Sequence, residues 1–226
     1  MTDKNNSNKS AGRRETRFLL LLVSLIALMV LEPLIFDLTR LNFLLDIFFS
    51  IILFTSIYAV SERKSTSFLA IILAVPKLLT LWALRFTTDP LLLFLDSIFG
   101  ITFIGFIIAL ILNHIFKQEQ VTPETIYGAI VVYILIGFMW VFLYSLTETF
   151  HPNSFSLTSE FVINFKKELY YFSFITLTTL GYGDITPVSE PAKSLVMLEA
   201  VVGQMYIAVL IARLVGMHIS QSLVKR

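Results

Sequence analysis

The chain has 226 residues, of which 56% are hydrophobic and only 15% are charged. Soluble domains average about 25% charged residues, so this composition is that of a membrane protein rather than a soluble enzyme. The absence of cysteine excludes disulfides, thiol nucleophiles and cysteine-ligated metals. The formal net charge of +1 gives no indication of a nucleic-acid partner.

The first half of the chain is expected to form four membrane-spanning helices. Apolar runs occupy residues 18–36, 43–60, 68–84 and 91–116, with polar turns between them. A spanning helix needs about 20 mainly apolar residues, which each run nearly provides or exceeds. The basic segment before the first run could also begin a secretory signal, but no small-residue cleavage site follows it. We therefore expect a first spanning helix at residues 18–36.

The second half predicts two more spanning helices and one helix too short to span. Thr122 suits an N-cap, Pro123 the first helical position and Glu124 the helix dipole, so a helix is expected to begin there. The apolar runs that follow are, in chain order, 126–146, 169–177 and 192–218. The middle run is too short to cross a bilayer.

Lysines and arginines are distributed unevenly between the two ends of these runs. Ten lie at the N-terminus, at residues 63–64, at Lys117 and at the C-terminus, and five lie on the opposite side. The positive-inside rule then places both termini in the cytoplasm of a multi-pass protein of the cell membrane. The loop between the fifth and sixth spans therefore enters the membrane from outside.

That loop contains a motif rich in threonine and glycine, Thr-Leu-Thr-Thr-Leu-Gly-Tyr-Gly-Asp, at residues 176–184. It resembles the selectivity filter of the potassium channel family, whose core is Thr-Val-Gly-Tyr-Gly. The core residues here are Thr179, Leu180, Gly181, Tyr182 and Gly183. Gly-Tyr-Gly alone is more often an ordinary turn, but the threonines, the aspartate and the half-length helix before it favour a filter.

The resemblance implies that four loops converge around a path for K⁺. Carbonyl oxygens of residues 179–182, with the Thr179 hydroxyl, would replace the hydration shell of the ion. Carbonyls that point to one axis require backbone angles of alternating hand, which Gly181 and Gly183 reach without steric cost. Leu180 stands where valine is usual, but only its carbonyl would face the ion. We therefore expect selectivity to survive this departure.

Further residues are implied to support the filter. Tyr182 would point away from the axis, and Tyr171 and Phe172 of the short helix would surround it. Thr178 and Asp184 would flank the filter. Glu199 is an acidic residue deep in the last span, which makes it a functional candidate. It could bond behind the filter to the pore helix, or it could simply pair with a neighbouring polar group.

The last span resembles the inner helix of prokaryotic potassium channels. Gly203 lies 20 residues after Gly183, where the family places a hinge glycine, although a small residue also permits close helix packing. Residues implied to face the cavity or gate are Gln204, Ile207, Ala208, Ile211, and Val215 or Ile219.

Four helices before a pore domain is the layout of voltage-gated-like channels, but the usual sensor is missing. Residues 91–115 contain no arginine or lysine, so conventional voltage gating is not expected. The buried charges are instead Asp46, Lys77 and Asp96. We hypothesise that Lys77, with or without Arg85, pairs with one of the two aspartates. A structural pair is favoured over a sensing one.

Together these features predict an all-α membrane protein. It would have six transmembrane helices, a re-entrant pore helix and a selectivity filter, and it would form a homotetramer in lipid. The expected regions are a tail (1–17), a four-helix peripheral domain (18–120), a pore domain (121–219) and a second tail (220–226). No cofactor beyond permeant K⁺, no enzymatic activity and no metal site from His114, His151 and His218 is expected.

The function predicted is passive, potassium-selective conduction. Three alternatives stay open at this point: a weakly selective cation channel, a potassium transporter subunit, and a regulatory membrane subunit that does not conduct. Transporters with filter-like loops usually carry four such loops in one chain, whereas this chain has one.

Overall fold

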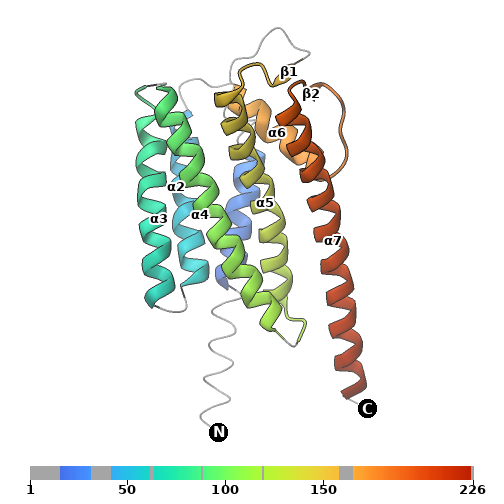
Figure 1. The fold of residues 1–226 in the computed structure, drawn as a ribbon. Helices are drawn as coiled ribbons and strands as arrows, with labels where there is room; N and C mark the ends of the chain where they lie inside the picture. Colours follow the sequence, from blue (N-terminus) through green and yellow to red (C-terminus); the bar gives the residue numbers. More distant parts are fainter. Residues whose placement is uncertain are drawn as a thin grey trace.

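The computed structural model describes residues 16–31, 42–61, 64–87, 89–118, 120–157 and 165–224 (Figure 1). The chain is mostly helical. Its elements are a first helix Thr16–Leu31, then α2 (Asn42–Val60), α3 (Lys64–Ala83), α4 (Pro90–Lys117), α5 (Pro123–Phe150), β1 (Phe155–Leu157), α6 (Phe165–Leu177), β2 (Ile185–Pro187) and α7 (Glu190–Val224).

Five of the described helices are long and apolar enough to cross a membrane. They are α2, α3, α4, α5 and α7. The first helix, Thr16–Leu31, is apolar but shorter. The last five residues of the first predicted span, 32–36, lie outside the described residues, so the sixth span stays a prediction.

Helix α5 begins at the residues that the sequence predicts. The Thr122 side chain accepts a hydrogen bond from the backbone N–H of Thr125 at 3.3 Å, and Pro123 begins the helix. This confirms the expected N-cap. Asp89 caps α4 in the same way, because its carboxylate accepts from the N–H of Leu91 at 2.8 Å. Both caps satisfy N–H groups that a helix start otherwise leaves unpaired.

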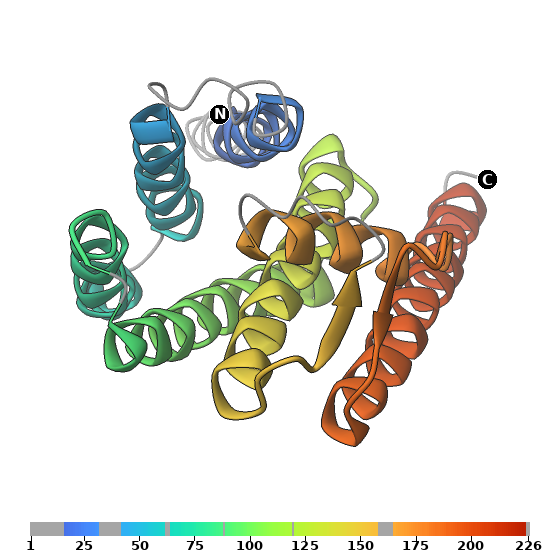
Figure 2. The ribbon, with the colours of Figure 1, turned by 90° about the horizontal axis from the view of Figure 1, so that it is seen from above.

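Helix α5 lies at the centre of the molecule, between α4 and α7 (Figures 1 and 2). It packs against α4, α6 and α7. Of its apolar stretch, 67% of the residues are buried, against 11% for α7. The view from above shows the first helix, α2 and α3 on the side of α4 that is away from α7 (Figure 2). Helix α7 therefore stands at one edge of the chain with most of its surface uncovered.

The expectation of an all-α chain misses two short strands. β1 and β2 pair antiparallel, with Ser156 opposite Thr186, at the same end of the molecule as α6 (Figure 1). The carbonyl of Ser154 also accepts the N–H of Val188 at 2.7 Å. Strands of three residues are too short to show a two-residue period in the sequence. Their pairing ties together the two ends of the loop that contains α6 and the filter motif.

Candidate functional site

Helix α6 is held against α5 by aromatic side chains. The ring of Phe138 on α5 meets the rings of Tyr170 and Phe174 edge-on, with centroids 5.3 and 5.5 Å apart. Phe172 packs against Tyr144 of α5 at 5.4 Å and is buried within the chain. The two edge-on pairs of Phe138 stabilise by about 0.5–1.5 kcal/mol each beyond their buried area. These contacts fix the direction in which α6 ends.

In the backbone after α6, every second residue has a positive φ angle, so left-handed and right-handed conformations alternate. φ is 59° at Thr179, 49° at Gly181 and 79° at Gly183, whereas Leu180 and Tyr182 are not in the positive region. Glycine adopts positive φ freely, but a β-branched threonine rarely does. Residues 179–183 therefore have the alternation expected of a segment whose carbonyl oxygens point to one side.

Backbone hydrogen bonds fasten the start of this segment to the end of α6. The carbonyl oxygen of Ile175 accepts from the N–H of Leu180 at 2.8 Å and from that of Gly181 at 3.1 Å. The N–H of Thr179 donates to the carbonyl of Thr176 at 2.9 Å. The Thr178 hydroxyl donates back to the carbonyl of Phe174 at 2.7 Å. The base of the motif is therefore fixed to α6, while Leu180 and Tyr182 are exposed within the single chain.

At the far end of the motif, Tyr171 and Asp184 are bonded to each other. The Tyr171 hydroxyl donates to Asp184 Oδ2 at 2.7 Å, and Asp184 Oδ1 accepts the N–H of Ile185 at 3.1 Å. The hydrogen bond to the Asp184 carboxylate raises the pKa of Tyr171, which lies outside the spanning helices, to about 12. The phenol therefore stays protonated, and able to donate to Asp184, up to a higher pH than an ordinary tyrosine.

Glu199 of α7 lies behind α6 in a fully buried position. The hydroxyl of Tyr144 on α5 donates to one carboxylate oxygen of Glu199. The hydroxyl of Ser173 on α6 lies 2.6 Å from the other carboxylate oxygen and 2.9 Å from the carbonyl of Gly137. Of the two roles considered for Glu199, this geometry supports the bond to α6, the helix that the sequence predicts as a pore helix. One carboxylate joins the three helices of the pore region.

Replacing Glu199 by leucine is expected to destabilise the folded protein. The Tyr144 hydroxyl would lose its acceptor in a buried place, at about 1–3 kcal/mol, whereas the Ser173 hydroxyl could still donate to the carbonyl of Gly137. Thermal unfolding of the purified protein measures the change. Glu199→Gln, which has the same shape and an amide oxygen that accepts hydrogen bonds, is the matched control and is expected to stay close to wild type. Equal losses in both variants would show that the hydrogen bonds contribute nothing.

Gly203 allows α7 to pack against the end of α6. A Cβ atom built on Gly203 would overlap the carbonyl oxygen of Leu177, the last residue of α6. The same carbonyl accepts from the Tyr133 hydroxyl of α5 at 3.3 Å. Helix α7 runs unbroken through Gly203. The structure therefore gives this glycine the close-packing role, while the hinge role stays a prediction.

The residues implied to face a cavity lie on one face of α7. Gln204, Ile207, Ala208, Ile211 and Val215 are all exposed within the single chain. Gln204 Nε2 donates to the hydroxyl of Thr179 at 3.2 Å. The α7 surface below the filter motif is therefore apolar except at Gln204.

The buried charges divide into two pairs. Lys77 of α3 forms a buried ion pair with Asp96 of α4, and the hydroxyl of Thr80 also donates to Asp96, at 2.9 Å. Arg85 lies 3.4 Å from Asp46 in a pair that is partly exposed. Of the two partners considered for Lys77, the structure places Asp96 beside it.

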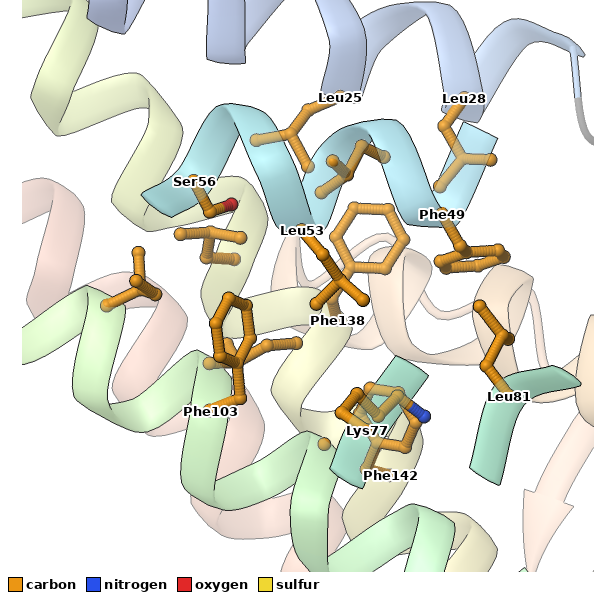
Figure 3. Close-up of a pocket in the computed structure, with 15 residues that line it drawn as sticks. Leu25, Leu28, Phe49, Leu53, Ser56, Lys77, Leu81, Phe103, Phe138 and Phe142 are labelled. Atoms are coloured by element: carbon orange, nitrogen blue, oxygen red, sulfur yellow. The ribbon is translucent and has the colours of Figure 1, made fainter. Parts of the chain in front are cut away.

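Lys77 also reaches the pore region. Its ammonium group lies 4.3 Å from the centre of the Phe142 ring on α5, a cation–π contact. Figure 3 shows the two side chains together beside a small cavity of about 40 Å³, whose other labelled side chains are almost all apolar. The pair therefore lies in an apolar environment between the peripheral helices and α5.

The sequence did not single out three residues of α5, α6 and α7 that form hydrogen bonds to another helix. Two are Ser173 and Tyr144, the partners of Glu199. The third is Arg213 of α7, which donates to the carbonyls of Ile115 at 2.9 Å and Phe116 at 2.8 Å at the end of α4. A cation inside an apolar span is a signal by itself, so Arg213 could have been found. Nothing in the sequence indicates the other two.

No group of three or more histidine, cysteine, aspartate or glutamate side chains could hold a metal ion within the described ranges. His114 of α4 instead lies 2.6 Å from Glu124 at the start of α5.

One comparison with known proteins gives a match in the region that contains the filter motif. Residues 154–219 match a family model described as an ion channel. No curated protein and no solved structure matches the chain. The matched residues run from the start of β1, through α6 and the filter motif, to near the end of α7. Residues 154–219 are therefore similar to an ion channel domain, and the five long apolar helices indicate a multi-pass membrane protein.

Proposed function

We propose that the chain is a subunit of a potassium-selective channel that conducts K⁺ passively across the cell membrane. The observation that carries the proposal is the alternating backbone of residues 179–183. With successive carbonyls on one side, each loop offers a row of oxygen atoms that can replace the water around K⁺. The ion channel match of residues 154–219 supports conduction.

The end of α6 adds an electrostatic contribution. A helix C-terminus carries about −0.5 elementary charge, which favours a nearby cation. Helix α6 ends at Leu177, two residues before Thr179, the first residue of the filter core. Its C-terminus therefore lies where an ion would enter the proposed filter from the inner side.

Four copies of the chain are proposed to surround one pore. Each chain has a single filter motif, and one row of carbonyls cannot enclose an ion. Helix α7 also leaves a large apolar surface uncovered, which is typical of a surface for assembly or for lipid. Its most exposed apolar side chains are Met197, Leu198, Val201, Met205, Val209, Ile211, Val215 and Ile219. A second copy of the chain on this face completes the cavity below the filter.

Reversal potentials of the purified protein in planar bilayers test the proposal. We expect the reversal potential to follow the K⁺ gradient and to change when Na⁺ replaces K⁺ on one side. Gly181→Ala is expected to abolish this selectivity, because alanine in the left-handed region costs about 1–2 kcal/mol in every subunit. Gly105→Ala is the matched control, since no atom lies within 4 Å of its added Cβ.

The same recordings separate the alternatives. A reversal potential that ignores exchange of K⁺ for Na⁺ identifies a weakly selective cation channel. Slow, saturable K⁺ uptake into vesicles without unitary currents identifies a transporter. If the purified protein gives neither currents nor K⁺ uptake, it is a subunit that does not conduct. Selective currents that survive Gly181→Ala would also contradict the proposal, because they would not pass through this motif.

A further inference from the structure

Gln204 of α7 is bonded to the first residue of the filter motif. Its Nε2 atom lies 3.2 Å from Oγ1 of Thr179, and the two residues are 25 positions apart in the sequence. The amide is the donor, so it meets the hydroxyl oxygen on a lone pair. Thr178 differs, because its hydroxyl donates back to its own helix. Of the two threonines, Thr179 is the one whose hydroxyl is held from α7.

The backbone conformation of Thr179 is unfavourable for threonine and requires stabilising contacts. Its φ of 59° lies in the left-handed region, which β-branched side chains rarely adopt. Such conformations persist where surrounding contacts fix them, and they are frequent at functional sites. Two hydrogen bonds act on Thr179: its N–H donates to the carbonyl of Thr176, and Gln204 donates to its side chain.

The position of Gln204 is itself fixed by its neighbour. Gly203 lies so close to the carbonyl of Leu177 that a Cβ atom there would overlap it. The α7 backbone therefore meets the base of the filter motif at one residue, and the next residue reaches the Thr179 hydroxyl. The backbone of α7 therefore keeps the side-chain amide of Gln204 within reach of Thr179 as long as its rotamer is unchanged.

From this geometry we infer that Gln204 is a positioning residue for the innermost ion site of the filter. The inference rests on the proposed function. A hydroxyl binds a cation through a lone pair, so an O–H bond directed at the ion would repel it. By donating to Oγ1 of Thr179, Gln204 restricts the directions left for the hydroxyl proton and holds the oxygen on the ion path. The ligand class is a dehydrated cation of the size of K⁺.

Ba²⁺ binding to the purified, assembled protein tests the inference by titration calorimetry in K⁺-free buffer. Ba²⁺ is close to K⁺ in size and doubly charged, so it binds the same oxygen atoms more strongly. Gln204→Leu is expected to weaken this binding about two- to tenfold, the range that one hydrogen bond spans. Gln204→Asn keeps an amide but is one methylene shorter, and it is expected to weaken binding equally. Gln118→Leu, the same substitution at the end of α4, is the control and should not change it.

A double-mutant cycle then shows whether the effect passes through Thr179. In a Thr179→Val background the hydroxyl is absent, so adding Gln204→Leu should change Ba²⁺ affinity no further. Thermal unfolding of the Gln204 variants should shift only slightly, because the bond that they lose is exposed in the single chain, whereas a purely structural role would shift it as much as it shifts Ba²⁺ binding. The inference is overturned if Gln204→Leu or Gln204→Asn binds Ba²⁺ with wild-type affinity. It is also overturned if Gln204→Leu weakens Ba²⁺ binding as much in the Thr179→Val background as in the wild type.

Reversal potentials of the wild type keep the two claims apart. If the wild type selects K⁺ and the Gln204 variants bind Ba²⁺ normally, only the role of Gln204 fails. If the wild type does not select K⁺, the proposed function fails and the inference falls with it. If the Gln204→Leu protein does not assemble, Gln204→Asn is the variant that tests the inference. Binding of Ba²⁺ by Gln204→Asn with wild-type affinity would then overturn it.

Discussion

Gly203→Ala is expected to abolish K⁺ currents and to destabilise the assembled protein. The added Cβ would overlap the carbonyl oxygen of Leu177 and would lie 3.0 Å from its Cδ1 atom. Overpacking of this kind costs about 1–3 kcal/mol when side chains can yield. Here the obstacle is backbone two residues before Thr179, so relief requires a shift of the filter base or of α7. Bilayer currents and thermal unfolding measure the two effects.

Gly216→Ala on the same helix is the matched control. Apart from its chain neighbours and the backbone of its own helix, nothing in the chain lies within 4 Å of a Cβ built there. Alanine is about 1 kcal/mol more favourable than glycine inside a helix, so this variant is expected to conduct and to unfold no earlier than wild type. The comparison also separates the two roles of Gly203. A pure hinge would alter opening while stability stayed intact, whereas close packing predicts that both are lost.

The long helices could be predicted because their signals are local. Apolar runs, polar turns and the Thr122–Pro123 start lie within short windows of sequence, and the structure places the helices within a few residues of the expected bounds. The short helix α6 was also expected, although it begins at Phe165 rather than Leu169. Its first turn, Phe165 to Glu168, contains three charged residues, which hydropathy alone excludes from an apolar run.

Contacts between distant segments could not be predicted in the same way. β1 and β2 are too short to show a period, and the bond from Tyr144 to Glu199 joins residues 55 positions apart. A buried acid in a span indicates that a partner exists, but many hydroxyls are available. Only the packing of α6 against α5 and α7 selects Tyr144 and Ser173.

The filter motif contains one feature that the sequence predicts and one that it does not. Positive φ at Gly181 and Gly183 could be expected, since glycine is the residue that adopts it readily. Positive φ at Thr179 could not, because threonine disfavours it. That conformation depends on hydrogen bonds to Thr176 and Gln204, and the second of these comes from another helix.

Lys77→Met is expected to destabilise the protein by about 3–5 kcal/mol, because it leaves the buried carboxylate of Asp96 without its cation. Lys77 is 5% exposed and Asp96 is 1% exposed, so water cannot replace the lost partner. The double variant Lys77→Met with Asp96→Leu should recover most of the loss, since apolar replacement of a buried pair is often neutral. Thermal unfolding measures each change.

Arg85→Met is the matched control for this series. Its partner Asp46 lies 3.4 Å away and both side chains are partly exposed, so the loss should stay within about 1 kcal/mol. A Lys77→Met protein as stable as Arg85→Met would mean that Asp96 finds another partner. A double variant as unstable as Lys77→Met would mean that the pair contributes through its hydrogen bonds rather than its charge.

The double variant also decides whether the buried pair senses voltage. One elementary charge moved across the membrane is worth about 2.3 kcal/mol per 100 mV. Lys77 and Asp96 carry opposite charges in direct contact, so moving them together transfers no net charge. Helix α4 adds no arginine or lysine before Lys117 at its end. We therefore expect the conducting double variant to keep the voltage dependence of the wild type. Voltage dependence that disappears with this pair, but survives Arg85→Met, would instead make Lys77 a sensor whose bond to Asp96 breaks as the pore opens.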